Sequence, residues 1–252
     1  MNKDARQTFI MEQLHQNKHI KIKTLSQQLN VSMETIRRDL TELEVHYRLD
    51  RMHGGAKIKQ TNIEEENFMQ RRISYRKEKK ELAKKAMPLI TENAFIALDV
   101  STTNLAIAKE LVFHFKQLTI LTNCFTIAQE LVLNSDFNVL VPPGLLTKEL
   151  FISGVSAVDF ISNYYTDLFF MSVSGISIHD GLMDYGFQEY EAKKAMLSNA
   201  HQIYAVADHH KFGQHSKIKI CPFNQISGII TDAGVQQEYI DYFRMKDIPF
   251  FY

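Results

Sequence analysis

Four arginines lie within residues 31–56, VSMETIRRDLTELEVHYRLDRMHGGA, and three of them stand out by their positions. Arg37 and Arg38 are adjacent, and Arg51 comes shortly before a His-Gly-Gly run. The planar guanidinium of arginine can grip a phosphate, or the O6/N7 edge of guanine, with two hydrogen bonds. The alternative is a solvated helix face with pairs such as Glu34–Arg38, and the two adjacent arginines by themselves favour that alternative. The residues around them decide between the two interpretations.

A second group of polar residues follows predicted strands of the later sequence. Its members are Asp99, Ser101, Thr102, Thr103, Thr122, Asn123, Asp208 and Lys211. Ligands of open α/β sheets bind beyond the carboxyl ends of strands. Hydroxyls and free N–H groups at a helix N-terminus suit a phosphate, and Lys211 can supply a point charge. The alternatives are an ordinary Ser/Thr helix cap at 101–103 and a solvated lysine at 211.

The first group must be positioned by short helices. Residues 6–16 carry apolar side chains at helical spacing and predict a first helix. Thr24, with Gln27 three residues later, is a capping-box pattern that predicts a second helix over residues 24–30. Asn30 then closes this helix, and a new helix start follows at once.

Ser32 is a good N-cap for this next helix, and Val31 and Ile36 are placed as a hydrophobic staple across it. The predicted apolar stripe consists of Met33, Ile36, Leu40 and Leu43. The opposite face carries Glu34, Arg38 and Thr41, with Thr35 and Arg37 on its flanks. Two short helices joined by a tight turn, the second with a basic outer face, predict a helix-turn-helix.

A hairpin is predicted directly after these helices. Residues 47–51 alternate in character, and His53-Gly54-Gly55 offers a turn that tolerates positive φ. A small hairpin after a helix-turn-helix is a wing, and Arg51 on it can contact the DNA backbone.

The run VSMETIRRDLTELE…LDRMHGGA resembles the N-terminal signature of the DeoR family of bacterial transcriptional regulators. That signature contains Val-Ser, Thr-Ile-Arg-Arg-Asp-Leu and Arg-x-His-Gly-Gly-Ala, and this sequence retains every element. The resemblance implies a winged helix-turn-helix domain that binds double-stranded operator DNA. The predicted DNA-binding residues are Ser32, Thr35, Arg37, Arg38, Arg51, His53 and Gly54.

The resemblance continues in the second half of the chain, where family members have a domain similar to ribose-5-phosphate isomerase. They generally sense phosphorylated sugars or related metabolites. The effector-binding residues implied by the matching motifs are Asp99, Ser101, Thr102, Thr103, Thr122, Asn123, Gly144, Gly181, Asp208 and Lys211. Ser101, Pro143 and Met183 depart from the family pattern. A side chain at 101, and a fixed φ without an N–H at 143, should alter a phosphate cradle.

Helices and strands alternate from residue 79 onward, which predicts an α/β fold with parallel strands. We therefore expect three segments: a winged helix-turn-helix domain at 1–58, a polar linker at 59–77, and an α/β domain at 78–252 for effector binding and oligomerisation. Formal charge supports the division, because residues 1–60 contain eleven Lys/Arg and seven Asp/Glu while the whole chain is neutral.

The composition predicts the cellular compartment of the protein and indicates which metal and cofactor sites to expect. Cys124 and Cys221 have no metal-ligand spacing around them, so we expect free thiols in a reducing cytoplasm. The sequence shows neither a signal peptide nor an apolar run of the about 20 residues that span a membrane. No metal, cofactor or catalytic residue is predicted.

The predicted function is sequence-specific transcriptional regulation by a dimer or tetramer. The resemblance implies repression of a carbohydrate-metabolism operon, relieved by a phosphorylated sugar. Three alternatives remain: a sugar-phosphate isomerase-like enzyme, a regulator whose effector pocket has degenerated, and a regulator that responds to a protein partner. Acid–base pairs for an enzyme would come from Asp208 with His209 and His210, or from Asp180 with Glu189.

Overall fold

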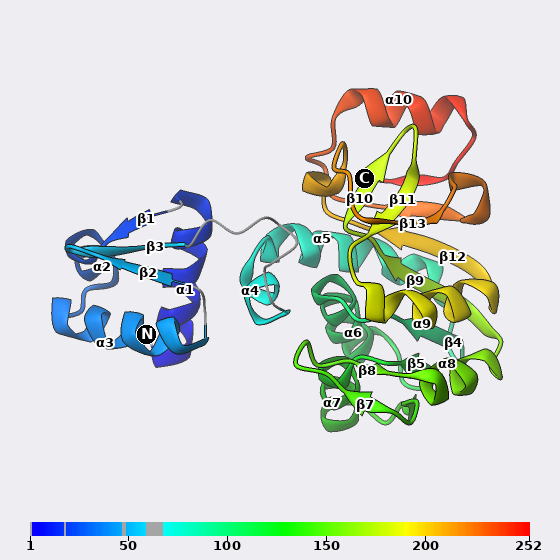
Figure 1. Ribbon diagram of the computed structural model, residues 1–252, viewed down its shortest axis with the longest axis horizontal. Helices are drawn as coiled ribbons and strands as arrows, with labels where there is room; N and C mark the ends of the chain where they lie inside the picture. Colours follow the sequence, from blue (N-terminus) through cyan, green and yellow to red (C-terminus); the bar gives the residue numbers. More distant parts are fainter. Residues whose placement is uncertain (1, 18, 47–48, 59–67) are drawn as a thin grey trace. The chain divides into compact units, whose positions relative to one another are not determined.

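The computed structural model describes residues 2–17, 19–46, 49–58 and 68–252 (Figure 1). The chain divides into two compact units, residues 1–76 and 77–252, called here the N-terminal and C-terminal units. Each unit has a hydrophobic core of its own. Residues 47, 48 and 59–67, which belong to the predicted wing and linker, lie outside the described residues.

The N-terminal unit combines short helices with a three-stranded antiparallel sheet in the order β1-β3-β2. Its elements are α1 (Lys3–Asn17), β1 (His19–Lys21), α2 (Ile22–Leu29), α3 (Met33–His46), β2 (Leu49–Met52), β3 (Gly55–Ile58) and α4 (Phe68–Ile73). Ile10, Leu14, Leu25, Ile36 and Leu40 form the centre of its core. This is the predicted winged helix-turn-helix, with α2 and α3 as the two helices.

The turn between α2 and α3 depends on local backbone chemistry. Asn30 adopts a left-handed conformation, φ 50° and ψ 48°, and ends α2 as predicted. The predicted capping box at Thr24 is wrong: α2 begins two residues earlier, at Ile22, and Lys21 provides no side-chain cap. Ile22 is buried, and this hydrophobic anchor sets the start of the helix in place of a cap.

Two further expectations differ from the structure. Met33 does not join the apolar stripe of α3, because it lies in the first turn with 47% of its surface exposed, while Ile36, Leu40 and Leu43 are buried. The end of the predicted linker is largely helical, since α4 and the start of α5 lie within it. Phe68 on α4 is 1% exposed.

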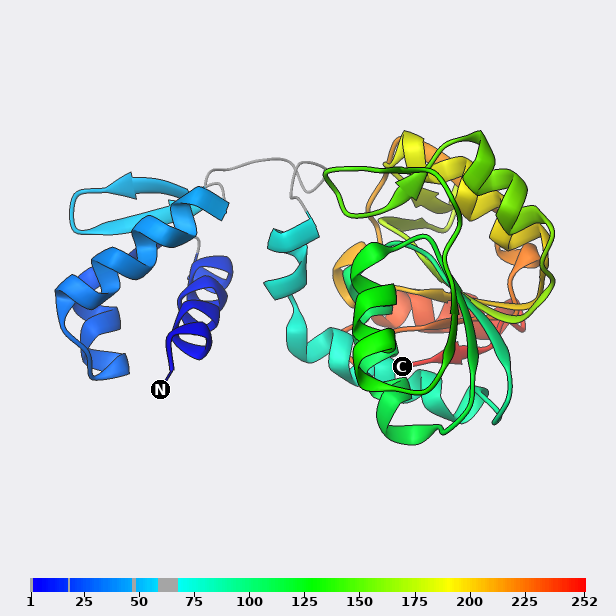
Figure 2. The ribbon, with the colours of Figure 1, turned by 90° about the horizontal axis from the view of Figure 1, so that it is seen from below.

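The C-terminal unit is built on a seven-stranded sheet in which every neighbouring pair is parallel, in the order β15-β14-β12-β9-β4-β5-β6. Its strands are β4 (Phe95–Leu98), β5 (Thr119–Thr122), β6 (Asn138–Leu140), β9 (Thr166–Ser172), β12 (Ala200–Val206), β14 (Gly228–Ile230) and β15 (Phe250–Phe251). Helices lie on both sides of this sheet (Figure 2). The predicted α/β class is confirmed.

The helices of this unit are α5 (Arg76–Ala86), α6 (Thr102–His114), α7 (Phe125–Asn134), α8 (Val155–Ser162), α9 (Phe187–Ser198) and α10 (Gln237–Met245), with short 3-10 turns at Met87–Leu89, His209–Lys211 and Phe223–Gln225. A hairpin of β7 (Leu145–Leu146) and β8 (Ile152–Ser153) and a small antiparallel sheet of β10 (Gly175–Ser177), β11 (Gly181–Asp184) and β13 (Ile218–Cys221) complete it. Within the described residues, no helix is both long and apolar enough to cross a bilayer.

The strand order determines where a ligand can bind. The chain crosses from β4 to β5 and β6 in one direction, and from β9 to β12, β14 and β15 in the other. The direction therefore reverses between β4 and β9, and such a switch point is where open α/β sheets form a crevice at their carboxyl edge. Asp99, Thr122, Ser172 and Asp208 all lie at or just beyond the carboxyl ends of strands.

Candidate functional site

Helix α3 begins with the predicted cap. The Ser32 hydroxyl accepts a hydrogen bond from the Thr35 N–H at 3.1 Å and lies 2.9 Å from the Thr35 hydroxyl. Val31 and Ile36 both pack into the core of the N-terminal unit, as a hydrophobic staple requires. The start of α3 is therefore held from both its polar and its apolar side.

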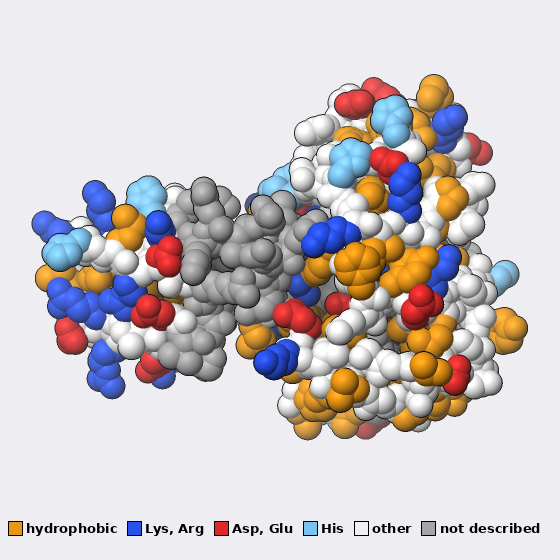
Figure 3. Space-filling model, in the orientation of Figure 1, with side chains coloured by type: hydrophobic (Ala, Val, Ile, Leu, Met, Phe, Trp, Pro, Cys, Tyr) orange, Lys and Arg blue, Asp and Glu red, His pale blue; other side chains and the backbone are white. Residues whose placement is uncertain are grey.

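The outer face of α3 presents Arg37 and Arg38 to solvent. Arg37 pairs with Glu34 at 3.1 Å, three residues earlier, so the expected alternative pair Glu34–Arg38 does not form. Arg38 makes no hydrogen bond or ion pair with the part of the chain that the structure describes. In Figure 3, Lys and Arg side chains gather on the visible face of this unit, with fewer acidic ones among them.

The wing is bonded to this helix. Arg51 on β2 donates to the Thr41 hydroxyl at 3.1 Å and lies 4.0 Å from the Glu44 carboxylate, both on α3. His53 and Gly54 are exposed at the tip of the hairpin, where Gly54 has φ +80°. Gly55 is needed for a different reason, because a Cβ at that position would lie 2.0 Å from the Ile20 carbonyl oxygen on β1.

An ion pair that sequence reasoning missed fixes α3 to α1. Arg6 Nε lies 2.5 Å from Asp39 Oδ2, and its Nη2 lies 3.0 Å from Oδ1. The two side chains are 13% and 3% exposed. The hydrogen bond to Asp39 raises the pKa of Arg6. Asp39 is the aspartate of the Arg-Arg-Asp-Leu run, so it points inward while the two arginines before it stay outside.

In the C-terminal unit, the segment after β4 begins helix α6. The Ser101 hydroxyl accepts a hydrogen bond from the Asn104 N–H at 2.8 Å, which makes Ser101 the N-cap of α6. Thr102 and Thr103 are buried in the first turn. Ser101 therefore acts as an ordinary helix cap, which was the alternative to phosphate binding for residues 101–103.

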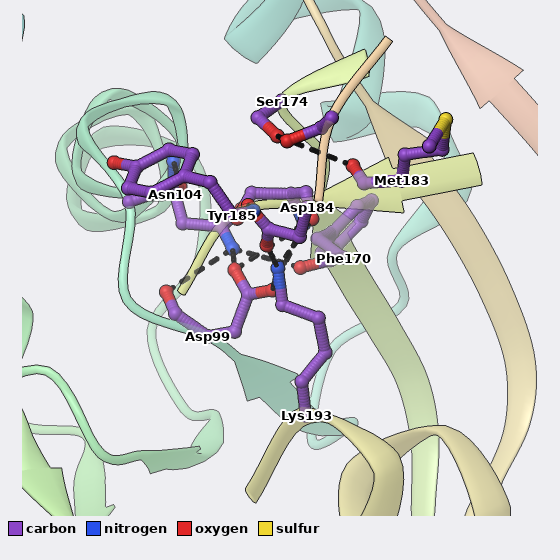
Figure 4. Close-up of polar contacts among 11 residues, drawn as sticks. Asp99, Asn104, Phe170, Ser174, Met183, Asp184, Tyr185 and Lys193 are labelled. Atoms are coloured by element: carbon purple, nitrogen blue, oxygen red, sulfur yellow. Dashed lines mark hydrogen bonds and ion pairs between the residues drawn. The ribbon is translucent and has the colours of Figure 1, made fainter. Parts of the chain in front are cut away.

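Asp99 lies at the switch point and is part of a buried ionic cluster with Lys193 and Asp184 (Figure 4). Its carboxylate accepts from the Ser172 N–H at 3.0 Å and from the Asn104 amide at 2.6 Å. Lys193 Nζ lies 3.2 Å from Asp99 Oδ2 and also pairs with Asp184. Asp99 therefore connects the end of β4 to β9 through Ser172 and to α9 through Lys193.

Lys193 is surrounded on all sides. Its ammonium also donates to the Ser172 carbonyl oxygen at 2.7 Å, so oxygen atoms of three residues surround its positive charge. Burial by itself disfavours the charge, but the Asp184 and Asp99 carboxylates raise the pKa of Lys193 above its ordinary value. A lysine held this way is a fixed positive charge and not a proton carrier. Neither Lys193 nor Asp184 is predicted as a site residue from the sequence, since nothing in their spacing singles them out.

Thr122 and Asn123 follow β5 and are buried. The Thr122 hydroxyl accepts from the Cys124 N–H at 3.1 Å. The Oδ1 atoms of Asn104 and Asn123 are buried and find no hydrogen-bond partner among the residues that the structure describes. Buried acceptors of this kind are uncommon, and a ligand hydroxyl is one group that would satisfy them.

Two glycines predicted at the effector site pack closely against distant backbone. Gly144 precedes β7, and a Cβ there would lie 2.5 Å from the Ser153 carbonyl oxygen. Gly181 begins β11 with φ +82°, and a Cβ there would lie 2.7 Å from the Cys221 carbonyl oxygen. Close packing of chain against chain therefore accounts for both glycines.

The loop after β12 carries Asp208 and Lys211. Asp208 accepts from the His210 N–H at 3.1 Å and lies 3.2 Å from the His210 ring. Burial opposes ionisation, but this ring and the charges of Lys211 and Lys79 hold the pKa of Asp208 below its ordinary value. His209 is held in turn by Asp232 beyond β14, at 2.7 Å from its N–H and 2.5 Å from its ring. Lys211 is half-buried beside this group.

Comparison with known protein families assigns the chain to one family. The model for the DeoR-like helix-turn-helix domain matches residues 6–62, and that for the DeoR C terminal sensor domain matches residues 74–233. The chain belongs to the DeoR family.

Two relatives of this DeoR-family protein match over almost their full lengths. The HTH-type transcriptional regulator GolR of Listeria innocua is 35% identical over 97% of this chain and 96% of its own. The glycerol-3-phosphate regulon repressor of Escherichia coli is 29% identical over 92% of each chain. The protein is accordingly a DNA-binding transcriptional regulator, and the predicted family membership is confirmed.

Solved structures resemble it less closely. Ribose 5-phosphate isomerase A from Methanocaldococcus jannaschii is 15% identical, with a TM-score of 0.40 over 53% of each chain. Nothing about activity follows from a likeness at that level.

Lys193→Met should lower the free energy of unfolding of the C-terminal unit by about 3–5 kcal/mol, because two buried carboxylates would lose their common cation. Since burial raises the pKa of Asp99, and Lys193 would no longer oppose that rise, the variant should regain part of its stability as the pH is lowered. Urea unfolding followed by circular dichroism at neutral and mildly acidic pH measures both effects.

Lys194→Met is the matched control, since Lys194 is partly exposed and lies over the Tyr190 ring at 6.0 Å. Its effect should stay below about 1 kcal/mol. Equal stability losses in the two variants would contradict a special role for the buried cation.

Proposed function

We propose that this protein represses a carbohydrate-metabolism operon in the bacterial cytoplasm and releases its operator when a phosphorylated sugar binds the C-terminal unit. DNA binding in this proposal is supported by the outer face of α3, where Arg37 and Arg38 are exposed on a helix anchored by Asp39. Rigid anchoring supports base recognition, because a side chain reads a base edge only when its helix is held in place.

The proposed DNA-binding residues divide by role. Arg37 and Arg38 on α3, with Thr35 beside them, are placed to contact base edges or nearby phosphates in the major groove. Ser32 positions the start of the helix, and its cap bond to Thr35 supports that role. Arg51, His53 and Gly54 on the wing are placed to contact the DNA backbone.

The proposed effector site lies along the carboxyl edge of the parallel sheet. The residues we assign to it are Ser101, Thr102, Thr103, Thr122, Asn123 and Lys211, with Asp99 and Asp208 organising them from within. Lys211 would supply positive charge to a phosphate, and the unpaired Asn123 Oδ1 would accept a hydrogen bond from a sugar hydroxyl. Glycerol 3-phosphate is the first candidate to test, because one relative is named a repressor of the glycerol-3-phosphate regulon.

A sugar-phosphate isomerase is the second candidate function, and the contacts of its candidate acid–base residues weigh against it. Asp208 is bonded to His210 and His209 to Asp232, and Asp180 pairs with His215 and Lys219. A general acid or base needs a free position within reach of its substrate. Turnover of ribose 5-phosphate by the purified protein would favour the enzyme.

We also propose that the protein acts as a dimer or tetramer through its C-terminal unit. A single winged helix covers little DNA, so two-fold oligomers on repeated half-sites are the common solution. Val132 and Leu133 on α7 and Leu145 on β7 are 63%, 71% and 71% exposed, and apolar side chains gather in this region in Figure 3. Light scattering that gives the mass of one chain, with and without DNA, would refute the proposal.

Arg37→Ala and Arg38→Ala should each weaken operator binding by about 1–3 kcal/mol if the arginine reads a base edge. Arg51→Ala should weaken binding to operator and random DNA alike, and reduce the salt dependence by about one unit of log–log slope. Fluorescence anisotropy titrations at several salt concentrations measure these changes.

Lys84→Ala, which removes an exposed cation from the C-terminal unit, is the control for general charge effects. Operator affinity that stays unchanged in both α3 variants would rule out the assignment of α3 as the DNA-reading helix.

Lys211→Ala should abolish the response of DNA binding to a phosphorylated sugar and leave operator affinity without ligand intact. A coupling of about 1–3 kcal/mol, or roughly 5- to 150-fold in affinity, would be lost. Ser101→Gly should strengthen phosphate binding if the side chain only narrows the cradle, since glycine is itself a tolerated N-cap.

A thermal-shift screen of phosphorylated sugars, followed by titrations of both variants, measures these effects. Weaker binding by Ser101→Gly would instead make the hydroxyl a ligand contact. If neither substitution alters any titration, the carboxyl edge is not a phosphate site.

A further inference from the structure

Helix α5 leads from the N-terminal unit into the C-terminal unit. Its first residue, Arg76, pairs with Glu12 of α1 at 3.5 Å, and both residues belong to the N-terminal unit. Tyr75, just before it, has φ +55°, so the chain turns sharply between α4 and α5. Ile73, at the end of α4, packs against the core of the N-terminal unit. The first residue of α5 therefore belongs to the N-terminal unit, and the rest of the helix belongs to the C-terminal unit.

The remaining turns of α5 are bonded to the carboxyl edge of the parallel sheet. Lys85 Nζ donates to the Thr231 carbonyl oxygen at 3.0 Å and pairs with Glu81 at 2.8 Å. Glu81 Oε1 also accepts from the Ala233 N–H at 3.3 Å. Two of these contacts, Lys85 with Thr231 and Glu81 with Ala233, hold the second half of α5 on the loop that follows β14.

That loop is connected to the proposed effector loop. Asp232, between the two residues that α5 contacts, binds the N–H and the ring of His209. Asp208 and Lys211 flank this histidine in the sequence. Lys79 on α5 is 6% exposed, and its charge acts on the Asp208 carboxylate. The groups that would sense a phosphate and the groups that hold α5 thus form one connected cluster.

We propose that α5 transmits the occupancy of the 208–211 loop to the DNA-binding unit. This inference rests on the proposed function, because it requires an anionic effector at Lys211. A phosphate there adds negative charge beside Asp208, and the two anions then share the positive charge of Lys211 and Lys79. The change reaches the loop after β14 through His209 and Asp232, and it alters how that loop holds Lys85 and Glu81. DNA affinity changes only to the extent that the ligand prefers one of the two arrangements.

The test uses the full chain with Lys85→Met and Glu81→Gln, and Lys84→Met as the matched control. Methionine preserves helix propensity at both lysine positions, and Lys84 is the exposed neighbour on the same helix. Operator affinity is measured with and without glycerol 3-phosphate, or with whichever phosphorylated sugar from the thermal-shift screen binds the wild type. Calorimetry gives the affinity of each variant for the same compound.

Both test variants should keep the wild-type affinity for the sugar phosphate, while its effect on operator affinity falls to within about twofold of none, against roughly 5- to 150-fold in the wild type and in Lys84→Met. A full response in both test variants would overturn the relay and leave the effector site standing. Loss of sugar-phosphate binding in Lys85→Met would place Lys85 in the site itself and also overturn the relay.

If no compound alters DNA binding by the wild type, the effector proposal fails. A second measurement then tests the relay by itself. Amide hydrogen exchange is compared between the wild type and Lys211→Ala without ligand. Removal of the Lys211 charge should change the exchange of α5 amides by about threefold or more, with α7 as an unaffected reference. Identical exchange in α5 would show that the loop and the helix are not coupled.

Discussion

The buried ammonium of Lys193 is the interaction on which the C-terminal unit depends. It joins α9 to Asp99 after β4, to Ser172 at the end of β9 and to Asp184 at the end of β11. Three buried charges in one place are tolerated only when each is paired and hydrogen-bonded, since desolvation otherwise costs several kcal/mol per ion. The cluster therefore holds the segments that meet at the switch point in one arrangement.

The N-terminal unit applies the same principle on a smaller scale. Arg6 and Asp39 form a two-point ion pair that is largely shielded from water and holds α3 against α1. One face of α3 is thereby committed to the fold, and the opposite face remains exposed for DNA. Arg51, bonded to Thr41, adds the wing to the same rigid surface. The basic residues are thus presented by a framework that is itself held together by buried charge.

The two units differ in how far their contacts could be foreseen. In residues 30–55, the cap at Ser32, the left-handed Asn30 and the positive φ of Gly54 are local features, and local chemistry predicts them. The capping box at Thr24 failed because burial of Ile22 set the start of α2. In the C-terminal unit, Gly144 and Gly181 matched a family pattern, but their surroundings are backbone carbonyls of distant segments. A pattern in sequence cannot distinguish a glycine beside a ligand from a glycine beside another strand.

The sequence by itself determined the family, the helix-turn-helix with its outward arginines, and the alternation of strands and helices that makes the sheet parallel. These follow from spacing over a few residues, where backbone geometry links position to direction. Only the tertiary structure brought Lys193 to Asp99, Arg6 to Asp39, and Lys85 to Thr231. These pairs are separated by 33 to 146 residues, and strand order and helix packing decide which charged side chains are buried together. The sequence alone therefore does not predict which of these residues pair, although it contains every one of them.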